Sequence, residues 1–436
     1  MKTCLKICIG ILLYGGVTLT PVVSQPIDIK LAGTCFQEAR SISDMDNGSL
    51  WGIRLYGPMV FVNEKTREGI ANQPVPVTGW TEKDGLFTGK VPDDIGLANT
   101  AFRWGNAVWS MVMTDYLTED SMAVRSIMMH ELWHQHEDEL VFLSHYDQAV
   151  HLNGKEGRAL LFLEWNALLK ACKSDSQERR EALRDALSFR KLRFEIYPAG
   201  KLSETARDLH EGMAEYTGMM LCGMDRSGKL KLLEQKVKSR DFGNTVVWTY
   251  AYISGPLYGF LLDEAGSGWT RTLHKETDLG DMLASAYHVR YDPADLAGLF
   301  VTGNIYGYDT IYSAETQRVA QSLARQETFK KRFQQGKTLF LPNHNLRIQF
   351  NPARITPFDT IGAVYGSLTG QSAWGDIQVD SVGILLLQGW KGLVIDVGPD
   401  WNPDHGLVFK GWSLTLNDQY DIVPSPNGWA VSRKKE

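Results

Sequence analysis

Ser121-Met-Ala-Val-Arg-Ser-Ile-Met-Met-His130-Glu131-Leu-Trp-His134 is the stretch from which the fold can be predicted. Its apolar residues fall nearly all round a helix of 3.6 residues per turn, which is typical of a helix enclosed by the core. Thr118 and Asp120 precede it and can cap its first free N–H groups. From here to about residue 335 the pattern stays helical.

His130-Glu131-Leu132-Trp133-His134 places two imidazoles on one face of that helix, one turn apart. Two imidazoles so placed can bind one Zn²⁺, and Glu131 beside them can take a proton from metal-activated water. A chain of this composition gives the pattern by chance in about one sequence in 70. The competing interpretation is a buried histidine pair that hydrogen-bonds to carbonyl groups. The spacing favours a catalytic metal site.

A catalytic zinc needs a third protein ligand and one open position. His136, Glu137 and Asp138 belong to the same predicted helix but point elsewhere on its circumference, so we expect solvated charges there. Glu164, in Leu163-Glu164-Trp165, is one candidate for the third ligand.

Leu209-His210-Glu211-Gly212-Met213-Ala214-Glu215-Tyr216 is the better source of a third ligand. Its two glutamates are four residues apart and share a helix face, so one can bind metal while the other supports a ligating histidine. Gly212 would let this helix approach the first closely. A glutamate-rich helix face that is merely solvated is the alternative. We expect the helix to begin at Ser203 and to end near Cys222-Gly223.

These motifs resemble the gluzincin metallopeptidases, the thermolysin and aminopeptidase N kind. Aminopeptidase N-like enzymes follow His-Glu-x-x-His with a helix of the form Glu-Gly-x-Ala, whose Glu is the third zinc ligand, and residues 211–214 match it. The resemblance implies zinc held by His130, His134 and Glu211, with Glu131 as the proton acceptor.

Two further positions take a role from this resemblance. Tyr252-Ile-Ser-Gly255 is similar to the Tyr-x-Lys-Gly helix start of aminopeptidase N-like and glycyl aminopeptidase-like enzymes, whose Tyr donates a hydrogen bond to the oxyanion. The resemblance nominates Tyr252 for that role, with core packing as the alternative. Glu215 falls where thermolysin-like enzymes carry a carboxylate that supports a ligand.

The chain departs from this family in two respects. Seventy-six residues separate His134 from Glu211, far more than in aminopeptidase N-like enzymes, and they contain two extra predicted helices. Ser254 replaces the usual Lys, and the Gly-x-Met-Glu-Asn motif that grips a substrate amino terminus is missing. The predicted function is therefore a secreted zinc-dependent metallopeptidase of open specificity. The alternative is a catalytically inactive gluzincin-like binding or structural protein of the cell envelope.

The partners expected from the sequence are a peptide or protein substrate and no nucleic acid. The formal net charge is −6 and no long basic run occurs, which argues against nucleic-acid binding. Residues 100–113 predict a hairpin that turns at Gly105-Asn106, and a strand of it could pair with an extended peptide. The 13 Trp residues leave carbohydrate binding as a weaker alternative.

The N-terminal 24 residues predict a secretory signal peptide. Lys2 and Lys6 precede an apolar run from Ile7 to Leu19, and a small residue at Ser24 marks the cleavage region. The run is too short for a comfortable membrane span, although a retained anchor is the alternative. We therefore expect a secreted or periplasmic protein with no stable membrane span after cleavage. The cysteines that follow the leader are expected as buried free thiols: Cys35, Cys172 and Cys222.

The predicted fold class is α+β. Residues 25–117 are expected to form a β-rich part of the catalytic unit, with strands at 51–56 and 59–62. Residues 118–336 would form a helical gluzincin-like zinc-binding domain with a helical insert at about 150–200. A C-terminal β-rich segment would follow over 337–436, with strands at 382–387 and 392–397.

Overall fold

A computed structural model of the chain describes residues 28–118, 120–140, 148–239, 246–291, 296–351 and 354–434. It contains both helices and sheets, so the predicted α+β class is confirmed. The chain divides into two compact units after Ser313, inside helix α12 (Tyr308–Phe329), rather than after residue 336 as expected. The predicted signal peptide lies outside the described residues. None of the described helices is long and apolar enough to span a membrane.

The first unit opens with helix α1 (Ile29–Asp46), which corrects the expectation of a β-rich start. Asp28 caps it by accepting hydrogen bonds from the backbone N–H groups of residues 30 and 31. Its buried face consists mostly of small residues, which explains why an apolar pattern was hard to see in the sequence. Residues 51–56, expected as a strand, form a turn and an irregular segment instead.

A six-stranded sheet follows, in the order β3-β4-β2-β1-β6-β5. Its strands are β1 (Met59–Val62), β2 (Glu68–Ala71), β3 (Thr81–Lys83), β4 (Leu86–Lys90), β5 (Thr100–Trp104) and β6 (Ala107–Met113). The predicted hairpin is confirmed, because β5 and β6 pair antiparallel around Gly105-Asn106. Phe36 of α1 stacks on Phe61 of β1, so α1 covers one face of the sheet. Strand β5 lies at the sheet edge.

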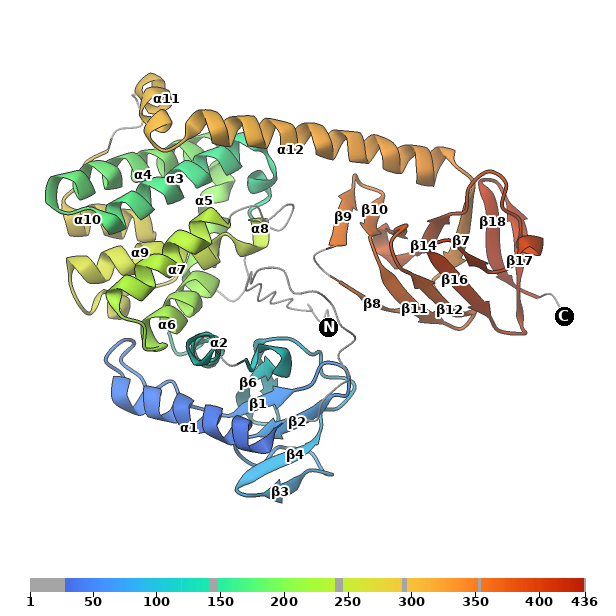
Figure 1. Cartoon of the computed structure of the whole chain (residues 1–436), viewed down its shortest axis with the longest axis horizontal. Coiled ribbons are helices and arrows are strands. Elements are labelled where there is room, and N and C mark those ends of the chain that lie inside the picture. The colour runs from blue at the N-terminus through green and yellow to red at the C-terminus, as the bar shows by residue number, and fades with distance from the viewer. Residues whose placement is uncertain are drawn as a thin grey trace. The chain divides into compact units, whose positions relative to one another are not determined.

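The rest of the first unit is helical around one large core. Its remaining elements are η1 (Thr114–Tyr116), α2 (Ser121–His134), η2 (Val150–Asn153), α3 (Lys155–Lys173), α4 (Ser176–Ile196), α5 (Pro198–Arg207), η3 (Asp208–Gly212), α6 (Met213–Leu221), α7 (Arg226–Lys238), α8 (Val246–Thr249), α9 (Ala251–Ala265), η4 (Trp269–Thr272), α10 (Leu279–Tyr287) and α11 (Leu296–Ile305). Figure 1 shows α2 nearly end-on between α1 and α6, which it contacts on either side. Asp120 caps α2 as expected.

The helical run from Pro198 to Leu221 passes through α5, η3 and α6, and η3 is a π-helical turn. The run begins at Pro198, so the prediction that Ser203 caps it was wrong, because proline is favoured in the first helical turn. Gly212 does permit a close helix crossing, but with α9 rather than with α2. A Cβ at Gly212 would meet the Gly255 Cα at 3.0 Å. Gly218 provides the close approach to α2, where a Cβ would meet the Ser126 carbonyl oxygen at 2.5 Å.

The second unit contains two antiparallel-rich sheets that enclose an aromatic and aliphatic core. The strand orders are β17-β18-β7-β14-β13-β10-β9 and β15-β16-β12-β11-β8. The first sheet has β7 (Thr338–Pro342), β9 (Ile355–Phe358), β10 (Gly362–Tyr365), β13 (Ile384–Leu387), β14 (Gly392–Asp396), β17 (Tyr420–Ser425) and β18 (Gly428–Arg433). The second has β8 (Arg347–Phe350), β11 (Leu368–Ser372), β12 (Gly375–Val379), β15 (Val408–Phe409) and β16 (Trp412–Leu416).

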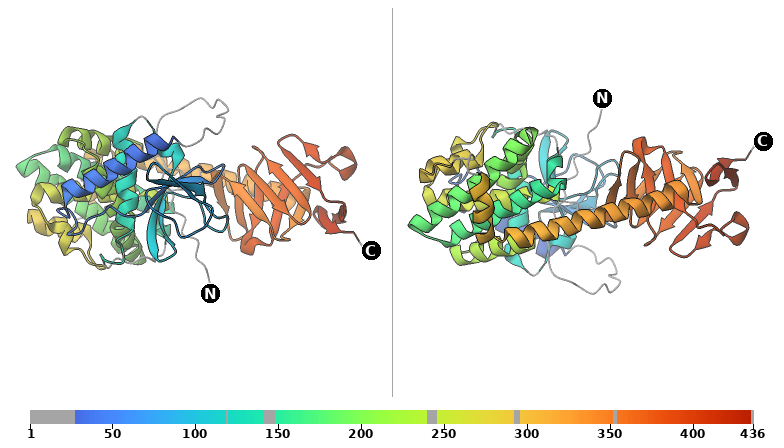
Figure 2. Two further views of the ribbon diagram at one scale, coloured as in Figure 1. Left: turned by 90° about the horizontal axis from the view of Figure 1, so that it is seen from below. Right: turned by 90° about the horizontal axis from the view of Figure 1, so that it is seen from above.

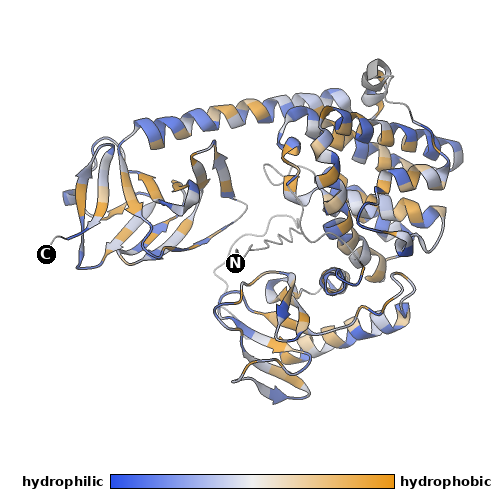
Figure 3. Ribbon diagram, turned by 180° about the vertical axis from the view of Figure 1, so that it is seen from behind, coloured by the Kyte–Doolittle hydropathy of each residue, from blue (hydrophilic) through white to orange (hydrophobic). Residues whose placement is uncertain are grey.

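The expected strands at 382–387 and 392–397 correspond to β13 and β14 of this unit. Along β11 and β12, buried and exposed residues alternate, because each strand has one face toward the core. Hydrophobic and hydrophilic bands accordingly alternate on the strands in Figure 3. Figure 2 shows the strands from two further sides, in orange to red, with the long helix α12 leading to them. The short turns η5 (Lys330–Gln335), η7 (Gln388–Trp390) and η8 (Pro403–His405) complete the described elements of this unit.

Candidate metal centre

Helices α2 and η3 bring the two histidines of the His-Glu-x-x-His motif against the glutamate of the second motif. The Nε2 atoms of His130 and His134 lie 3.1 Å apart. The Glu211 Oε2 atom lies 3.7 Å from each of them. All three side chains are buried. The structure therefore places the three ligands expected from the sequence around one point.

The spacing of these three atoms fits a divalent metal ion. Metal–nitrogen and metal–oxygen bonds of about 2.0–2.2 Å in a tetrahedron put neighbouring ligand atoms about 3.3 Å apart. Two imidazole nitrogens that face each other within a buried space also favour a cation between them, because each can present a lone pair. This buried group of histidines and a glutamate can hold a metal ion.

A carboxylate lies against the outer nitrogen of each histidine. The Nδ1 atom of His130 is 3.0 Å from Glu215 Oε2, and the Nδ1 atom of His134 is 2.7 Å from Glu137 Oε1. Such contacts keep the Nδ1 proton in place and turn the Nε2 lone pair toward a metal. Glu215 therefore lies where the sequence led us to expect it.

Glu137 corrects an expectation. Helix α2 ends at His134, and the chain turns so that Glu137 folds back under the histidine instead of facing solvent. Its carboxylate is buried, and burial raises its pKa, but the charge and hydrogen bonds of His134 and His210 outweigh burial and hold the pKa well below its usual range. It is therefore an ionised group of the site.

Glu131 lies inside this cluster without a direct partner for one of its oxygens. Its Oε2 atom is buried and has no hydrogen-bond partner among the described residues. Burial raises the pKa of Glu131 to about 7, although the charges of His130 and His134 act in the opposite direction. The Ser110 hydroxyl on β6 donates a hydrogen bond to the Glu131 backbone carbonyl at 2.7 Å, which ties α2 to the sheet. A carboxyl group with a pKa near neutrality is suited to accept and release a proton.

The neighbouring charged groups of the site shift one another's pKa values: His130 lies against two carboxylates, and Glu215 lies against His130 and Lys236. Burial alone would lower the pKa of His130, but the adjacent carboxylates of Glu211 and Glu215 raise it to about 9. Burial likewise opposes ionisation of Glu215, yet the charge of Lys236 and the contact with His130 lower its pKa to about 2. The Lys236 Nζ atom donates to Glu215 Oε1 at 2.6 Å. The carboxylates stay charged and can compensate a bound cation.

Tyr252, at the start of α9, completes the wall of the site. Its hydroxyl donates a hydrogen bond to Glu211 Oε2 at 2.6 Å, and its ring stacks parallel to that of His130 at 5.7 Å. The hydroxyl therefore lies next to the oxygen that faces the two histidines. The close crossing of Gly212 and Gly255 brings α9 near enough for this contact.

The π-turn η3 decides which carboxylates reach the histidines. Steps of four, three and four residues would place Glu204, Asp208, Glu211 and Glu215 on one face of an unbroken α-helix. One extra residue in the π-turn rotates the following segment by about 100° relative to the preceding one. As a result Glu204 and Asp208, the first pair of carboxylates, face α4. Glu211 and Glu215, the second pair, face α2.

The first pair of carboxylates belongs to a separate arginine cluster, which consists of Glu164, Arg190, Arg193, Glu204 and Asp208. Arg193 contacts Glu164 Oε2 at 2.6 Å and Glu204 Oε2 at 2.7 Å, and Arg190 contacts Asp208 Oδ2 at 3.1 Å. Tyr258 donates to Glu164 Oε1 at 2.7 Å. Glu164 is therefore committed to arginines and is not the third metal ligand.

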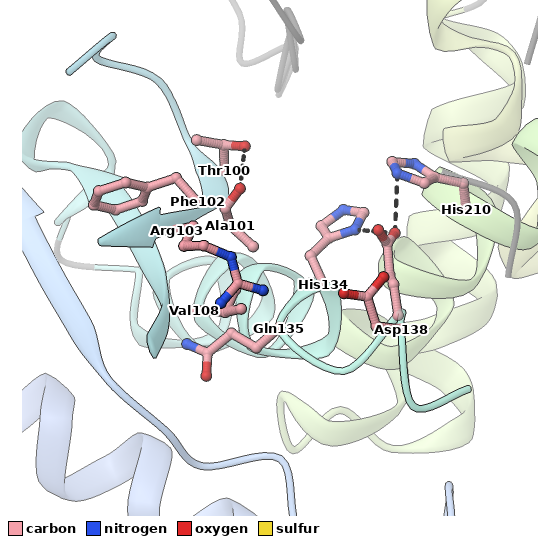
Figure 4. A pocket seen from close by; sticks show the side chains of 10 residues that line it. Thr100, Ala101, Phe102, Arg103, Val108, His134, Gln135, Asp138 and His210 are labelled. Carbon is pink, nitrogen blue, oxygen red and sulfur yellow. Dashed lines mark hydrogen bonds and ion pairs between the residues drawn. The ribbon is translucent and has the colours of Figure 1, made fainter. Parts of the chain in front are cut away.

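We call His130, His134 and Glu211 the metal group. A cavity of about 210 Å³ opens beside it, against His134. Figure 4 shows the residues of β5 on one side of it and His210 on the other, with His134 between them. Because β5 pairs with β6 on one edge only, every second residue along it turns its N–H and C=O groups away from β6. The closing pair Trp104–Ala107 implies that Ala101 and Arg103 turn outward.

Sequence reasoning missed two residues of this site. Glu137 was expected in solvent, and His210 received no role. Glu137 Oε1 lies 3.0 Å from His210 Nε2 and 2.7 Å from His134 Nδ1, and Figure 4 shows dashed lines running from His134 and from His210. The only signal in the sequence was the position of His210 directly before Glu211.

Comparisons of the chain with protein-family models, with curated proteins and with solved structures find no match.

Proposed function

We propose that the chain is a zinc-dependent metallopeptidase that hydrolyses peptide bonds. The observation that supports this most is the convergence of His130 Nε2, His134 Nε2 and Glu211 Oε2, with the partly uncompensated carboxyl group of Glu131 in the same buried cluster. Two imidazoles and one carboxylate form a common ligand set of catalytic zinc. Four protein ligands would instead close the site, as in structural zinc centres.

When bound, zinc acts as a Lewis acid that activates water and polarises a carbonyl group. The chain would supply the proton chemistry: Glu131 accepts a proton from the attacking water and passes it to the leaving amine. Burial, which raises the pKa of Glu131 to about 7 in the metal-free chain, supports this role. Once Glu211 binds the metal, the Tyr252 hydroxyl next to Oε2 is placed to donate a hydrogen bond to the oxyanion that develops on the substrate.

The cavity supports an extended peptide as the substrate. The outward N–H and C=O groups of Ala101 and Arg103 would pair with the backbone of a peptide laid along β5, as in β-strand addition. Such pairing uses backbone groups that every peptide has, and it would bring a scissile bond alongside His134. A leader at residues 1–24 would deliver this activity outside the cytoplasm.

Metal content is the first test of this proposal. Elemental analysis of purified protein after zinc reconstitution should find about one zinc per chain, and the Glu211→Ala variant should lose it. Hydrolysis should then be sought with a mixture of fluorogenic peptides. A zinc-loaded protein that cleaves none of them would favour the alternative, a gluzincin-like binding or structural protein.

The Glu131→Gln variant tests the proposed mechanism. It should keep zinc, because the ligands are unchanged, and lose peptide hydrolysis by roughly 10²–10⁴-fold, the range typical of a general base. The matched control is Glu139→Gln, the same substitution on a largely exposed side chain beyond the end of α2, which should leave turnover unchanged. Undiminished hydrolysis by Glu131→Gln would refute this mechanism.

A further inference from the structure

Four side chains around the site form a closed circuit of contacts. His134 Nδ1 lies 2.7 Å from Glu137 Oε1, which lies 3.0 Å from His210 Nε2. His210 Nδ1 lies 3.4 Å from Glu211 Oε1, and Glu211 Oε2 lies 3.7 Å from His134 Nε2. The circuit links the end of α2 to η3, so it connects the two elements that carry the metal ligands.

His210 lies against two carboxylates of this circuit, and the oxygens in these two ion pairs are not among the three atoms that face the metal position. Each of its ring nitrogens faces a carboxylate oxygen, one from Glu137 and one from Glu211. The residue is buried, with 5% of its surface exposed. Its contacts reach both a ligating carboxylate, through the oxygen turned away from the histidines, and the carboxylate that orients His134.

We propose that His210 is a positioning residue that sets the separation of His134 and Glu211 and thereby tunes metal binding. This inference rests on the proposed function, since it takes the group of His130, His134 and Glu211 as the metal site. Glu211 Oε1, which also lies 3.8 Å from Arg207 Nη2, is within ion-pair distance of His210 Nδ1, and this attraction would keep Oε2 turned toward the histidines. The contact with Glu137 holds the carboxylate that directs His134 Nε2 toward the same point.

The same geometry raises a rival role for His210. His134, Glu137 and His210 offer ligand atoms within 4.8 Å of one another, so they could hold a second metal ion. The 2.7 Å contact of His134 Nδ1 with Glu137 argues against this, because a histidine that presents Nε2 to one metal keeps its proton on Nδ1. With a proton on Nδ1, His134 donates a hydrogen bond to Glu137 Oε1 and cannot bind a second metal through that nitrogen. Only Glu137 and His210 would then remain as ligands of a second ion.

The test compares His210→Ala and His210→Gln with the unmodified chain, using Zn²⁺ and Co²⁺ as probes. Competition with a chromophoric chelator should show that His210→Ala weakens Zn²⁺ binding about 10–100-fold, the usual effect of losing a group that orients a ligand. The stoichiometry should stay at about one ion per chain. The visible absorption bands of bound Co²⁺ should shift, because the angle between His134 and Glu211 changes.

The Gln variant should recover part of the affinity, since its amide can still donate to a carboxylate. The control is His151→Gln, a partly buried histidine whose Nε2 atom lies 2.6 Å from Glu204 Oε1, and it should leave Zn²⁺ affinity and the Co²⁺ spectrum unchanged. If circular dichroism shows that His210→Ala does not fold, the Zn²⁺ affinity and the Co²⁺ spectrum are measured on Glu137→Gln instead. This variant weakens the contact between Glu137 and His210 by changing the carboxylate, and it should have the same effect on both quantities.

Three results would overturn the inference. An unaltered affinity and Co²⁺ spectrum in a folded His210→Ala protein would show that the circuit has no influence on the metal. Two ions in the unmodified chain and one in His210→Ala would make His210 a ligand. An unmodified chain that binds neither ion would remove the proposed metal site itself, which is distinguishable from the first result because only the first requires a metal-loaded protein.

Discussion

The metal group and the arginine cluster are two buried collections of charge in the first unit, and both draw carboxylates from the same helical run. Glu204 and Asp208 face arginines on one side of the π-turn, whereas Glu211 and Glu215 face histidines on the other. The carboxylates are alike in chemistry, and three of them are buried while Glu215 is partly buried. Their partners therefore make the difference between the two regions.

An arginine guanidinium stays protonated in proteins and offers only donors, so it saturates carboxylates and leaves no lone pair for a metal. A histidine can release its proton and present a lone pair, while its other nitrogen keeps a carboxylate partner. The arginine cluster consequently braces α3 and α4, the extra helices between the two motifs, against the ligand-bearing helix. The metal group can present convergent lone pairs once its histidines give up their Nε2 protons, so it could hold a metal ion.

The largest expected effect is the loss of stability when an arginine of the arginine cluster is removed, and this loss should not depend on zinc. Arg193→Met leaves Glu164 and Glu204 as buried carboxylates without their shared partner, which should lower the free energy of unfolding by about 3–5 kcal/mol. Urea unfolding should show the same loss with zinc and with a chelator. Arg184→Met, on an exposed position of the same helix, should change stability by less than about 0.5 kcal/mol. A loss confined to the zinc-loaded protein would mean that the two regions are not independent.

A rise in pH from 6.5 to 9 should weaken the metal group much more than the arginine cluster, and only in the chelated protein, because the cost of ionising Asp208, whose pKa burial raises to about 7, develops mostly below this window. The pKa of His130 is raised from 6.5 to about 9, so its contribution to stability is full below pH 6.5 and disappears as pH rises through 9. The pKa of Glu204 is lowered from 4.5 to about 2, so its contribution is full above pH 4.5 and disappears only as pH falls through 2.

Between pH 6.5 and 9 we therefore expect the chelated protein to lose up to about 3 kcal/mol of stability. Zinc should abolish this loss, because a ligating histidine carries no proton on Nε2. Urea unfolding at the two pH values, with a chelator and with zinc, measures the difference. The His130→Gln variant should show a flatter alkaline response in the chelator. A chelated protein of constant stability over this window would contradict the pairing of His130 with the carboxylates.

The smallest expected effect comes from adding one methyl group where Gly255 of α9 crosses Gly212 of η3. A Cβ at residue 255 would meet the Gly212 Cα at 2.3 Å, so Gly255→Ala must push α9 away from η3. We expect a destabilisation of about 1–3 kcal/mol, the usual range for overpacking. Zinc affinity should also fall, because Tyr252 and Glu211 lie on the two separated elements. Gly96→Ala, which has open space around it, should change neither quantity, and an equal effect of both variants would argue against the crossing as the cause.

Short-range spacing predicted a good part of the site. His130 and His134, and likewise Glu211 and Glu215, are four residues apart, and a helix places such pairs on one face whatever the rest of the chain does. The hairpin at 100–113 was equally predictable, because its turn residues and flanking strands are neighbours in sequence. Helix α1 was missed, since its core face is built from small residues that give a weak apolar signal.

By itself, the sequence determined that two pairs of metal-binding residue types would each share a helix face, and that strands would precede and follow the helices. Only the tertiary structure decided the partners. The π-turn rotates Glu211 toward the histidines and away from Arg190 and Arg193, and the turn after α2 returns Glu137 to His134 and His210. These outcomes depend on helix phase and on contacts between distant segments, which are set by packing of the whole core rather than by local spacing.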